Sequence, residues 1–93
     1  MLPFYVYILQ CSDKSYYVGH TDNIEKRMSE HKLKLCGGYT ASRLPVKLMF
    51  VQECGTREEA IAAERQIKGW RRSKKEALIK GDWQTIIELS NKK

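Results

Sequence analysis

The sequence predicts an α+β fold in which helices cover a small, mostly antiparallel sheet. Three observations lead there: the length, a hairpin pattern near the N-terminus, and helix-start signals after it. The 93 residues suit one compact domain, which we expect to span 1–93. The expected order of elements is ββαβααα.

Two short strands are expected first. Residues 4–10 (FYVYILQ) are rich in β-branched and aromatic side chains, as strands are. Residues 12–15 have turn chemistry, and residues 16–19 form the returning strand.

The turn suggests a register for this hairpin. If Gln10 pairs with Tyr16, then Tyr7 lies opposite Gly19. Side chains alternate along strands, so one face of the hairpin carries Tyr5, Tyr7, Tyr17 and Gly19. Because Gly19 has no side chain, another group can approach closely beside Tyr7.

Capping patterns and breakers define the later elements. Asp22 with Glu25, and Thr56 with Glu59, are typical of helix N-termini. The expected elements are a helix from Asp22 to about Leu33, a loop over 34–45, a strand over 46–53, and helices from Thr56 to about Gly69, Ser73 to Lys80 and Asp82 to Leu89.

The charge balance favours an anionic partner. Seventeen Lys and Arg residues against eleven Asp and Glu residues give a net charge of +6. Nucleic acid is the partner that this balance suggests, although some soluble proteins are simply basic. No run approaches the roughly 18 apolar residues of a membrane span, and no charged leader precedes the hairpin. We therefore expect a soluble, cytoplasmic protein with no membrane partner.

The cysteines give no sign of a metal centre. Cys11, Cys36 and Cys54 form neither a CxxC pair nor a zinc spacing. We expect free thiols in a reducing compartment, buried as small apolar residues.

Polar residues fall on the inward stripe of the first helix. Ile24, Met28 and His31 lie at i, i+4 and i+7, and Arg27 lies one turn before His31. A histidine in such a place can be a satisfied core residue, and an arginine at the edge of a stripe can extend to water.

A carboxylate falls on the apolar side of the next helix. Ala60, Glu64 and Ile67 share one face. Glutamate is rarely buried unless it is paired or binds a metal. The alternatives for Glu64 are a metal site or an ion pair, with Lys68 or with a basic residue of another element.

Tyrosine, arginine, histidine and one carboxylate together suit phosphodiester hydrolysis. One carboxylate can hold Mg²⁺ when phosphate and water complete the coordination shell. Arginine stabilises charge that develops on phosphate oxygens. A tyrosine with its usual pKa near 10 can act as a base only if its surroundings favour loss of the proton.

The order of these residues resembles the GIY-YIG endonucleases. YVY at 5–7, a nine-residue spacer and YVG at 17–19 match the paired motif that names the family, and Arg27, His31 and Glu64 continue the match. The resemblance covers residues 4 to about 80 and is greatest to small standalone members related to the nuclease domain of the excinuclease C subunit. Tyr5 replaces the first glycine of the family motif, and Val18 replaces an isoleucine.

The resemblance implies a three-stranded antiparallel sheet flanked by helices and a metal-dependent DNA endonuclease. It implies a single divalent ion, Mg²⁺ or Mn²⁺, and a role in DNA repair or processing. Because one small domain offers little surface for reading bases, we expect structure-selective or nonspecific cleavage. The implied roles are a general base for Tyr7, orientation of water or phosphate for Tyr17, close backbone approach at Gly19, a phosphate clamp for Arg27, tuning of Tyr7 or proton relay for His31, and metal binding for Glu64.

Two sets of residues are candidates for DNA contact. Around Trp70 lie Lys68, Arg71, Arg72 and Lys74, which could equally form a solvated charged face. The loop over 34–45 offers Tyr39, Thr40 and Arg43, followed by Lys47, or it makes no contact at all.

Other functions remain open from the sequence alone. The chain could be a nucleic-acid-binding module that has lost catalysis, or a protein-interaction module acting with a protein partner or as a homodimer. His20 could touch phosphate or simply cover the sheet edge.

Overall fold

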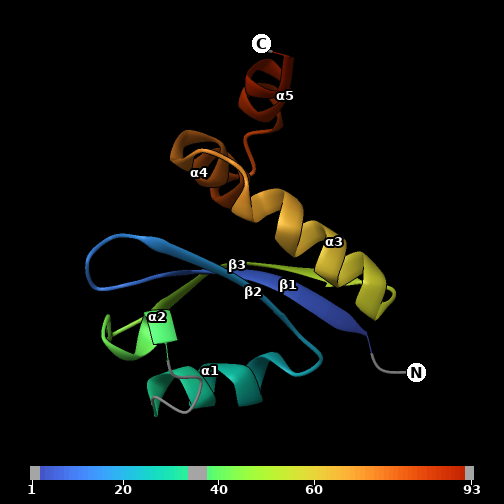
Figure 1. The fold of residues 1–93 in the computed structure, drawn as a ribbon. Coiled ribbons are helices and arrows are strands. Elements are labelled where there is room, and N and C mark those ends of the chain that lie inside the picture. Colours follow the sequence, from blue (N-terminus) through green and yellow to red (C-terminus); the bar gives the residue numbers. More distant parts are fainter. Residues whose placement is uncertain (1–2, 34–37, 92–93) are drawn as a thin grey trace.

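The computed structural model describes residues 3–33 and 38–91. A sheet lies between two helical layers, with α1 and α2 on one side and α3 and α4 on the other (Figure 1). The α+β fold with a three-stranded antiparallel sheet is confirmed. The elements are β1 (Phe4–Gln10), β2 (Tyr16–Thr21), α1 (Ile24–Lys32), α2 (Gly38–Ala41), β3 (Lys47–Cys54), α3 (Arg57–Lys68), α4 (Arg72–Lys80) and α5 (Trp83–Asn91).

The strand order is β2-β1-β3, which leaves β2 at an edge. The hairpin register is the predicted one, with Tyr7 opposite Gly19 and Gln10 opposite Tyr16. Strand β3 pairs with β1 on the other side, and this register shifts between Ile8 and Leu9.

Alternation along β1 gives the molecule two cores. The α3 side buries Val6, Ile8, Val18, Cys54, Ala60, Ile67, Ala77, Leu78 and Ile86. The α1 side buries Tyr7, Leu9, Cys11 and Val46, against which Tyr17, Ile24 and Met28 pack. Because the central strand is covered on both faces, apolar side chains occupy both of its alternating sets.

The structure corrects two predicted element starts. Asn23 rather than Asp22 caps α1, since its side chain accepts a hydrogen bond from the amide of Lys26 at 3.0 Å. Thr21 fixes this arrangement by accepting from the amide of Asn23 at 3.1 Å. Helix α4 begins after Arg71 instead of at Ser73.

Two other starts are confirmed, and the predicted loop is partly wrong. Thr56 caps α3 and Asp82 accepts from the amide of Thr85, both at 3.1 Å. The short helix α2 lies inside the segment expected to be loop, so the order is ββααβααα. Residues 34–37 of that loop lie outside the described residues.

The cysteines behave as buried apolar side chains. Cys11 and Cys54 are free and buried, and burial raises the pKa of each thiol. Cys36 lies outside the described residues. Within 3–33 and 38–91, no helix has the length and apolar character needed to cross a membrane.

Candidate active site at the edge of the sheet

Tyr7 and Gly19 meet across the β1–β2 ladder. Tyr7 is completely buried, and its hydroxyl lies over the backbone of Gly19. A Cβ atom at position 19 would lie 2.5 Å from the Tyr7 hydroxyl oxygen, closer than real Cβ contacts. The space beside Gly19 is therefore occupied by the Tyr7 hydroxyl itself, so the expectation that another group approaches there beside Tyr7 is not met.

His31 comes to the same place from α1. The stripe of Ile24, Met28 and His31 faces the sheet, and His31 Nε2 lies 3.0 Å from the Tyr7 hydroxyl. Burial lowers the pKa of His31, and the positive charge of Arg27 lowers it further. The ring is therefore neutral at pH 7.

Tyr17 packs against both of these rings. Its ring centroid lies 6.4 Å from that of Tyr7 and 5.5 Å from that of His31. On the far side it stacks with Tyr39 at 6.2 Å. Tyr17 is half-buried, whereas Tyr7 has no exposed surface, so water reaches the Tyr7 hydroxyl only if a neighbouring ring moves.

Thr40 completes a buried chain of hydrogen bonds. Its hydroxyl lies 2.8 Å from His31 Nδ1, and its side chain is buried. The expectation that Thr40 offers a surface contact to a substrate strand is wrong, because the hydroxyl faces the core. No motif in the sequence singles out this threonine as a partner of His31.

Glu64 lies on the other face of the sheet, on α3. Its Oε1 accepts a hydrogen bond from His20 Nδ1 at 2.8 Å, and its Oε2 pairs with Lys68 Nζ at 3.0 Å. Burial alone would raise the pKa of Glu64, but the hydrogen bonds from His20 and Lys68 outweigh it and hold the pKa below its usual value. Both ion-pair partners considered from the sequence, Lys68 and a basic residue of another element, are thus present.

Arg27 reaches the edge between the two faces. It lines a small polar hollow of about 150 Å³ together with Phe4, His20, Thr21, Asp22 and Arg57. Its Nε also donates to Glu30 at 3.1 Å. His20 belongs to both this hollow and the Glu64 pair, and so connects the arginine to the carboxylate.

Two residues that line this polar hollow, His20 and Arg57, were not predicted as site residues. His20 was left undecided, and Arg57 was not considered. Arg57 is the first residue of α3, a place with no catalytic motif, so only the tertiary fold brings it beside Arg27.

The donor set around Glu64 is small. Among the described residues, no group of three or more His, Cys, Asp and Glu side chains could hold a metal ion. One carboxylate still fits Mg²⁺, which commonly takes one or two protein carboxylates and completes its octahedral shell with phosphate and water. A cation at Glu64 would have to displace His20 or Lys68 from its oxygens.

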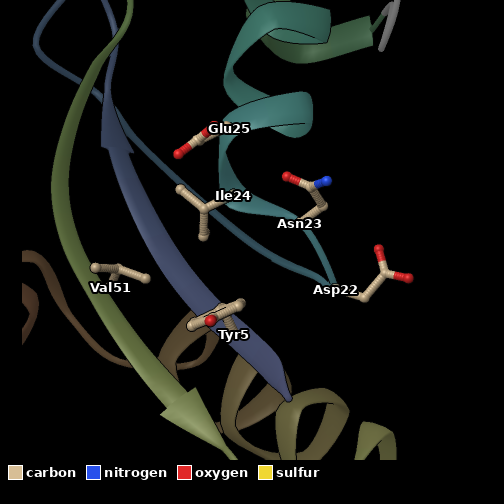
Figure 2. A pocket seen from close by; sticks show the side chains of 6 residues that line it. All are labelled: Tyr5, Asp22, Asn23, Ile24, Glu25 and Val51. Carbon is tan, nitrogen blue, oxygen red and sulfur yellow. The ribbon is translucent and has the colours of Figure 1, made fainter. Parts of the chain in front are cut away.

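A larger hollow of about 370 Å³ lies between α1 and the sheet (Figure 2). Tyr5, Ile24 and Val51 provide its apolar surface, and Asp22 and Glu25 make its rim acidic. The lining does not include Tyr7, Tyr17 or His31. An acidic rim repels phosphate, so this hollow is a poor place for the scissile group.

The loop residues proposed for DNA contact are engaged with the protein. Arg43 Nε donates to Asp13 at 3.1 Å, and its Nη1 donates to the carbonyl of Tyr39 at 2.8 Å. Its guanidinium lies 3.9 Å from the centre of the Tyr39 ring. One face of Tyr39 is stacked on Tyr17, so Arg43 and Tyr39 brace Tyr17. Lys47 is exposed at the start of β3.

The basic residues near α4 are mostly paired as well. Lys68 pairs with Glu64, and Arg72 pairs with Glu76 at 3.3 Å. Arg72 also covers the Tyr16 ring, and Lys74 lies over the ring of Trp70. Arg71 is exposed. These contacts position three of the four cations, Lys68, Arg72 and Lys74, beside acidic or aromatic side chains.

Comparison with known proteins gives a consistent result. The family model described as the GIY-YIG catalytic domain matches residues 3–77. A UPF0213 protein of Streptococcus pneumoniae is 40% identical over 75 residues, which cover 81% of this chain and 76% of the relative. A UPF0213 protein of Syntrophus aciditrophicus is 48% identical over 77 residues, covering 82% and 88%.

A solved structure is also similar. The solution NMR structure of a UPF0213 protein from Bacillus halodurans has a TM-score of 0.55 and 36% sequence identity. The match covers 84% of this chain and 83% of that one. The three-stranded sheet and its flanking helices are therefore shared with a solved relative.

Proposed function

Because the chain belongs to the GIY-YIG family of nuclease domains, we propose that it is a divalent-metal-dependent endonuclease that hydrolyses phosphodiester bonds in DNA. A domain of this size has little surface for reading bases, so the expected cleavage is structure-selective or nonspecific. We extend the proposal to a role in DNA repair or processing in the cytoplasm.

The observation that carries the proposal is the hydrogen bond between Tyr7 and His31 beside Gly19. A tyrosine that is to act as a base must pass its own proton to an acceptor, and His31 Nε2 lies within hydrogen-bond reach of the Tyr7 hydroxyl at 3.0 Å. Gly19 leaves the Tyr7 hydroxyl next to bare backbone. Movement of the half-buried Tyr17 ring would admit the attacking water.

Arg27 is the proposed phosphate clamp. It shares its hollow with His20 and Arg57, so up to three cationic groups could surround an anion there. Such groups stabilise the charge that develops on the phosphate oxygens in the transition state, because they are in place before the reaction begins.

Glu64 is the residue proposed to hold a single Mg²⁺ or Mn²⁺ ion, with phosphate and water as the remaining ligands. When bound, the ion would polarise the phosphate as a Lewis acid. Lys68 would leave the carboxylate and be available to a neighbouring phosphate.

The charge of the protein supports binding to DNA. Each phosphate neutralised by Lys or Arg makes the affinity more dependent on salt. The residues proposed for these contacts are Tyr39, Arg43, Lys47, Lys68, Arg71, Arg72 and Lys74, with Arg43 and Tyr39 acting through Tyr17. A protein partner or a second copy of the chain would extend this surface.

The proposal is tested by cleavage of labelled duplex, single-stranded, flap and branched DNA with Mg²⁺, Mn²⁺ or EDTA. We expect metal-dependent cutting that is lost in Glu64→Gln. Glu58→Gln, an exposed residue in the first turn of the same helix, is the matched control and should cut normally. Equal cutting by wild type and Glu64→Gln would remove the metal assignment.

The second candidate is a nucleic-acid-binding module that does not cut. It is favoured by the two partners of Glu64, which give that carboxylate a structural role in the absence of metal. Salt-sensitive binding to every substrate without cleavage under any metal would select this alternative.

A further inference from the structure

The buried chain of Tyr7, His31 and Thr40 indicates how the site would handle a proton. The two links are 3.0 Å from the Tyr7 hydroxyl to His31 Nε2 and 2.8 Å from His31 Nδ1 to the Thr40 hydroxyl. The three residues are 0, 1 and 2% exposed. Water is therefore excluded as a substitute partner for the ring nitrogens. Which group donates and which accepts in each of these two hydrogen bonds is set by the protein groups themselves.

A neutral imidazole has one donor nitrogen and one acceptor nitrogen. If Nδ1 carries the hydrogen, it donates to Thr40 and Nε2 accepts from Tyr7. In the opposite tautomer Thr40 donates to Nδ1, and Tyr7 must accept from Nε2.

The chemistry of the three groups favours the first arrangement. A phenol is a more acidic donor than an aliphatic alcohol, and an imidazole nitrogen is the best acceptor in the chain. The strongest pairing therefore has Tyr7 donating to Nε2, while the alcohol of Thr40 accepts from Nδ1.

We propose that Thr40 is a positioning residue that holds His31 in the Nδ1–H tautomer and keeps Nε2 available for the Tyr7 proton. Thr40 is supplied by α2, next to α1 on the same side of the sheet (Figure 1). Its carbonyl accepts from the amide of Arg43 at 3.0 Å, and the carbonyl of Arg43 accepts from the amide of Ser12 at 2.9 Å. These two backbone hydrogen bonds connect Thr40 to the hairpin turn and so fix its position relative to His31.

The consequence for the reaction rests on the proposed function. As the attacking water gives a proton to Tyr7, the original hydroxyl proton of Tyr7 passes to His31 Nε2. One O–H bond of water breaks and one forms on Tyr7, while the old O–H bond of Tyr7 breaks and an N–H bond forms. The hydroxide bonds to phosphorus while the bond from phosphorus to the leaving ester oxygen breaks, and that oxygen departs as an alkoxide that takes a proton from solvent. The imidazolium keeps the proton received from Tyr7. Tyr7 then works as a relay and never has to exist as a free phenolate.

The opposite tautomer would stop this relay, because Nε2 would already carry a hydrogen. The role of Thr40 is thus like that of a carboxylate that orients a catalytic histidine through its second nitrogen. A threonine achieves this without adding charge to the core.

The test measures the tautomer directly by ¹⁵N NMR of protein labelled only in histidine. The chain has two histidines, so His20→Gln assigns the remaining ring signals to His31. We expect the Nδ1–H tautomer in the wild type. In Thr40→Val, which keeps the shape and removes the hydroxyl, the hydrogen should move to Nε2. Cleavage should fall about 10- to 100-fold, as for other residues that orient a catalytic group, and Thr40→Ser should restore both.

An Nε2–H tautomer in the wild type would overturn the proposal, as would Nδ1–H retained in Thr40→Val. Wild-type cleavage by Thr40→Val would overturn the relay. If Thr40→Val does not fold, the tautomer of His31 in the wild type and in Thr40→Ser tests the proposal: Nδ1–H in both supports it, and Nε2–H in either overturns it. A wild type that has the Thr40-dependent tautomer but cuts no DNA overturns the proposed function and leaves the tautomer assignment standing.

Discussion

The Tyr7 hydroxyl oxygen lies 2.5 Å from the point where a Cβ of residue 19 would be. Tyr7 can therefore keep this position only if residue 19 is glycine. The ring carbon that bears the hydroxyl is almost as close, at 2.7 Å. Tyr7 would have to move as a whole ring within a filled core, and its bond to His31 would be lost.

Gly19→Ala is therefore expected to lower the free energy of unfolding by about 1–3 kcal/mol, as overpacking does, and to abolish cleavage. Thermal unfolding and the DNA panel measure the two effects. Gly69→Ala is the control, because its Cβ would meet nothing closer than 3.5 Å and its backbone is helical. An unchanged melting temperature in Gly19→Ala would contradict the close packing of Tyr7 against residue 19.

Arg43→Ala is expected to destabilise the protein as well as weaken its action on DNA. The side chain bonds Asp13 and the carbonyl of Tyr39 and covers the Tyr39 ring, contacts that together contribute about 1 kcal/mol. Melting temperature and DNA affinity should fall together, since Tyr39 holds Tyr17. If affinity falls while the melting temperature stays the same, Arg43 contacts the substrate directly.

Lys68→Gln should strengthen binding of Mn²⁺ to the metal-free protein, because Lys68 occupies Glu64 Oε2. Lys68 is half exposed, and an ion pair with an exposed lysine contributes roughly 0.2–1 kcal/mol, which corresponds to about a 1.5- to 5-fold gain in affinity. Titration calorimetry measures the affinity. Arg65→Gln removes the same charge from an exposed position on the same helix and should change it less. Equal effects of the two substitutions would mean that only net charge matters.

Stability should depend on pH through His31. Its pKa is lowered in the folded protein by burial and then by Arg27, with Glu30 opposing, while the unfolded chain takes up the proton near pH 6.5. The unfolded state binds more protons in this window, so stability is full above pH 6.5 and falls as the pH drops towards the folded pKa. Tyr7, Tyr17 and Thr40 also face the ring.

The melting temperature should thus fall below pH 6.5, and His31→Gln should reduce that slope. The carboxylates with lowered pKa are Asp13, Glu64 and Asp82. They lose their stabilising contribution only below their usual values of 3.8 to 4.5, so their effect is separated from that of His31. A slope that is the same in His31→Gln would show that another group titrates.

The sequence predicts the parts of this molecule that depend on local pattern. Alternation in 4–10 and 16–19 gave the pairing of Tyr7 with Gly19, and helical spacing gave the inward stripe that ends at His31. The Asn23 cap was missed because Asp22 is an equally good cap, and the hydrogen bond from Asn23 to Thr21 decides between them.

Contacts between distant elements were harder to foresee. The four-residue helix α2 is too short for a periodic signal, so the approach of Thr40 to His31 has no trace in local sequence. The pairing of His20 with Glu64 depends on how α3 crosses β2, which spacing along the chain does not specify. The pairing of Lys68 with Glu64 could be considered because the two residues are four apart on one helix, whereas the partners of Arg43 had no signal in the sequence.

The neighbouring positions Gly19 and His20 point to opposite sides of the sheet, one towards Tyr7 and the other towards Glu64. A slip of β2 by one residue against β1 would exchange them, which would drive an imidazole into Tyr7 and leave Glu64 facing a glycine. The two halves of the candidate site would fail at once, although neither would have lost a residue. The length of the hairpin turn, at the opposite end of β2 from His20, therefore determines which residue of β2 faces Tyr7 and which faces Glu64. Changing that length by one residue would inactivate the site as completely as removing Glu64.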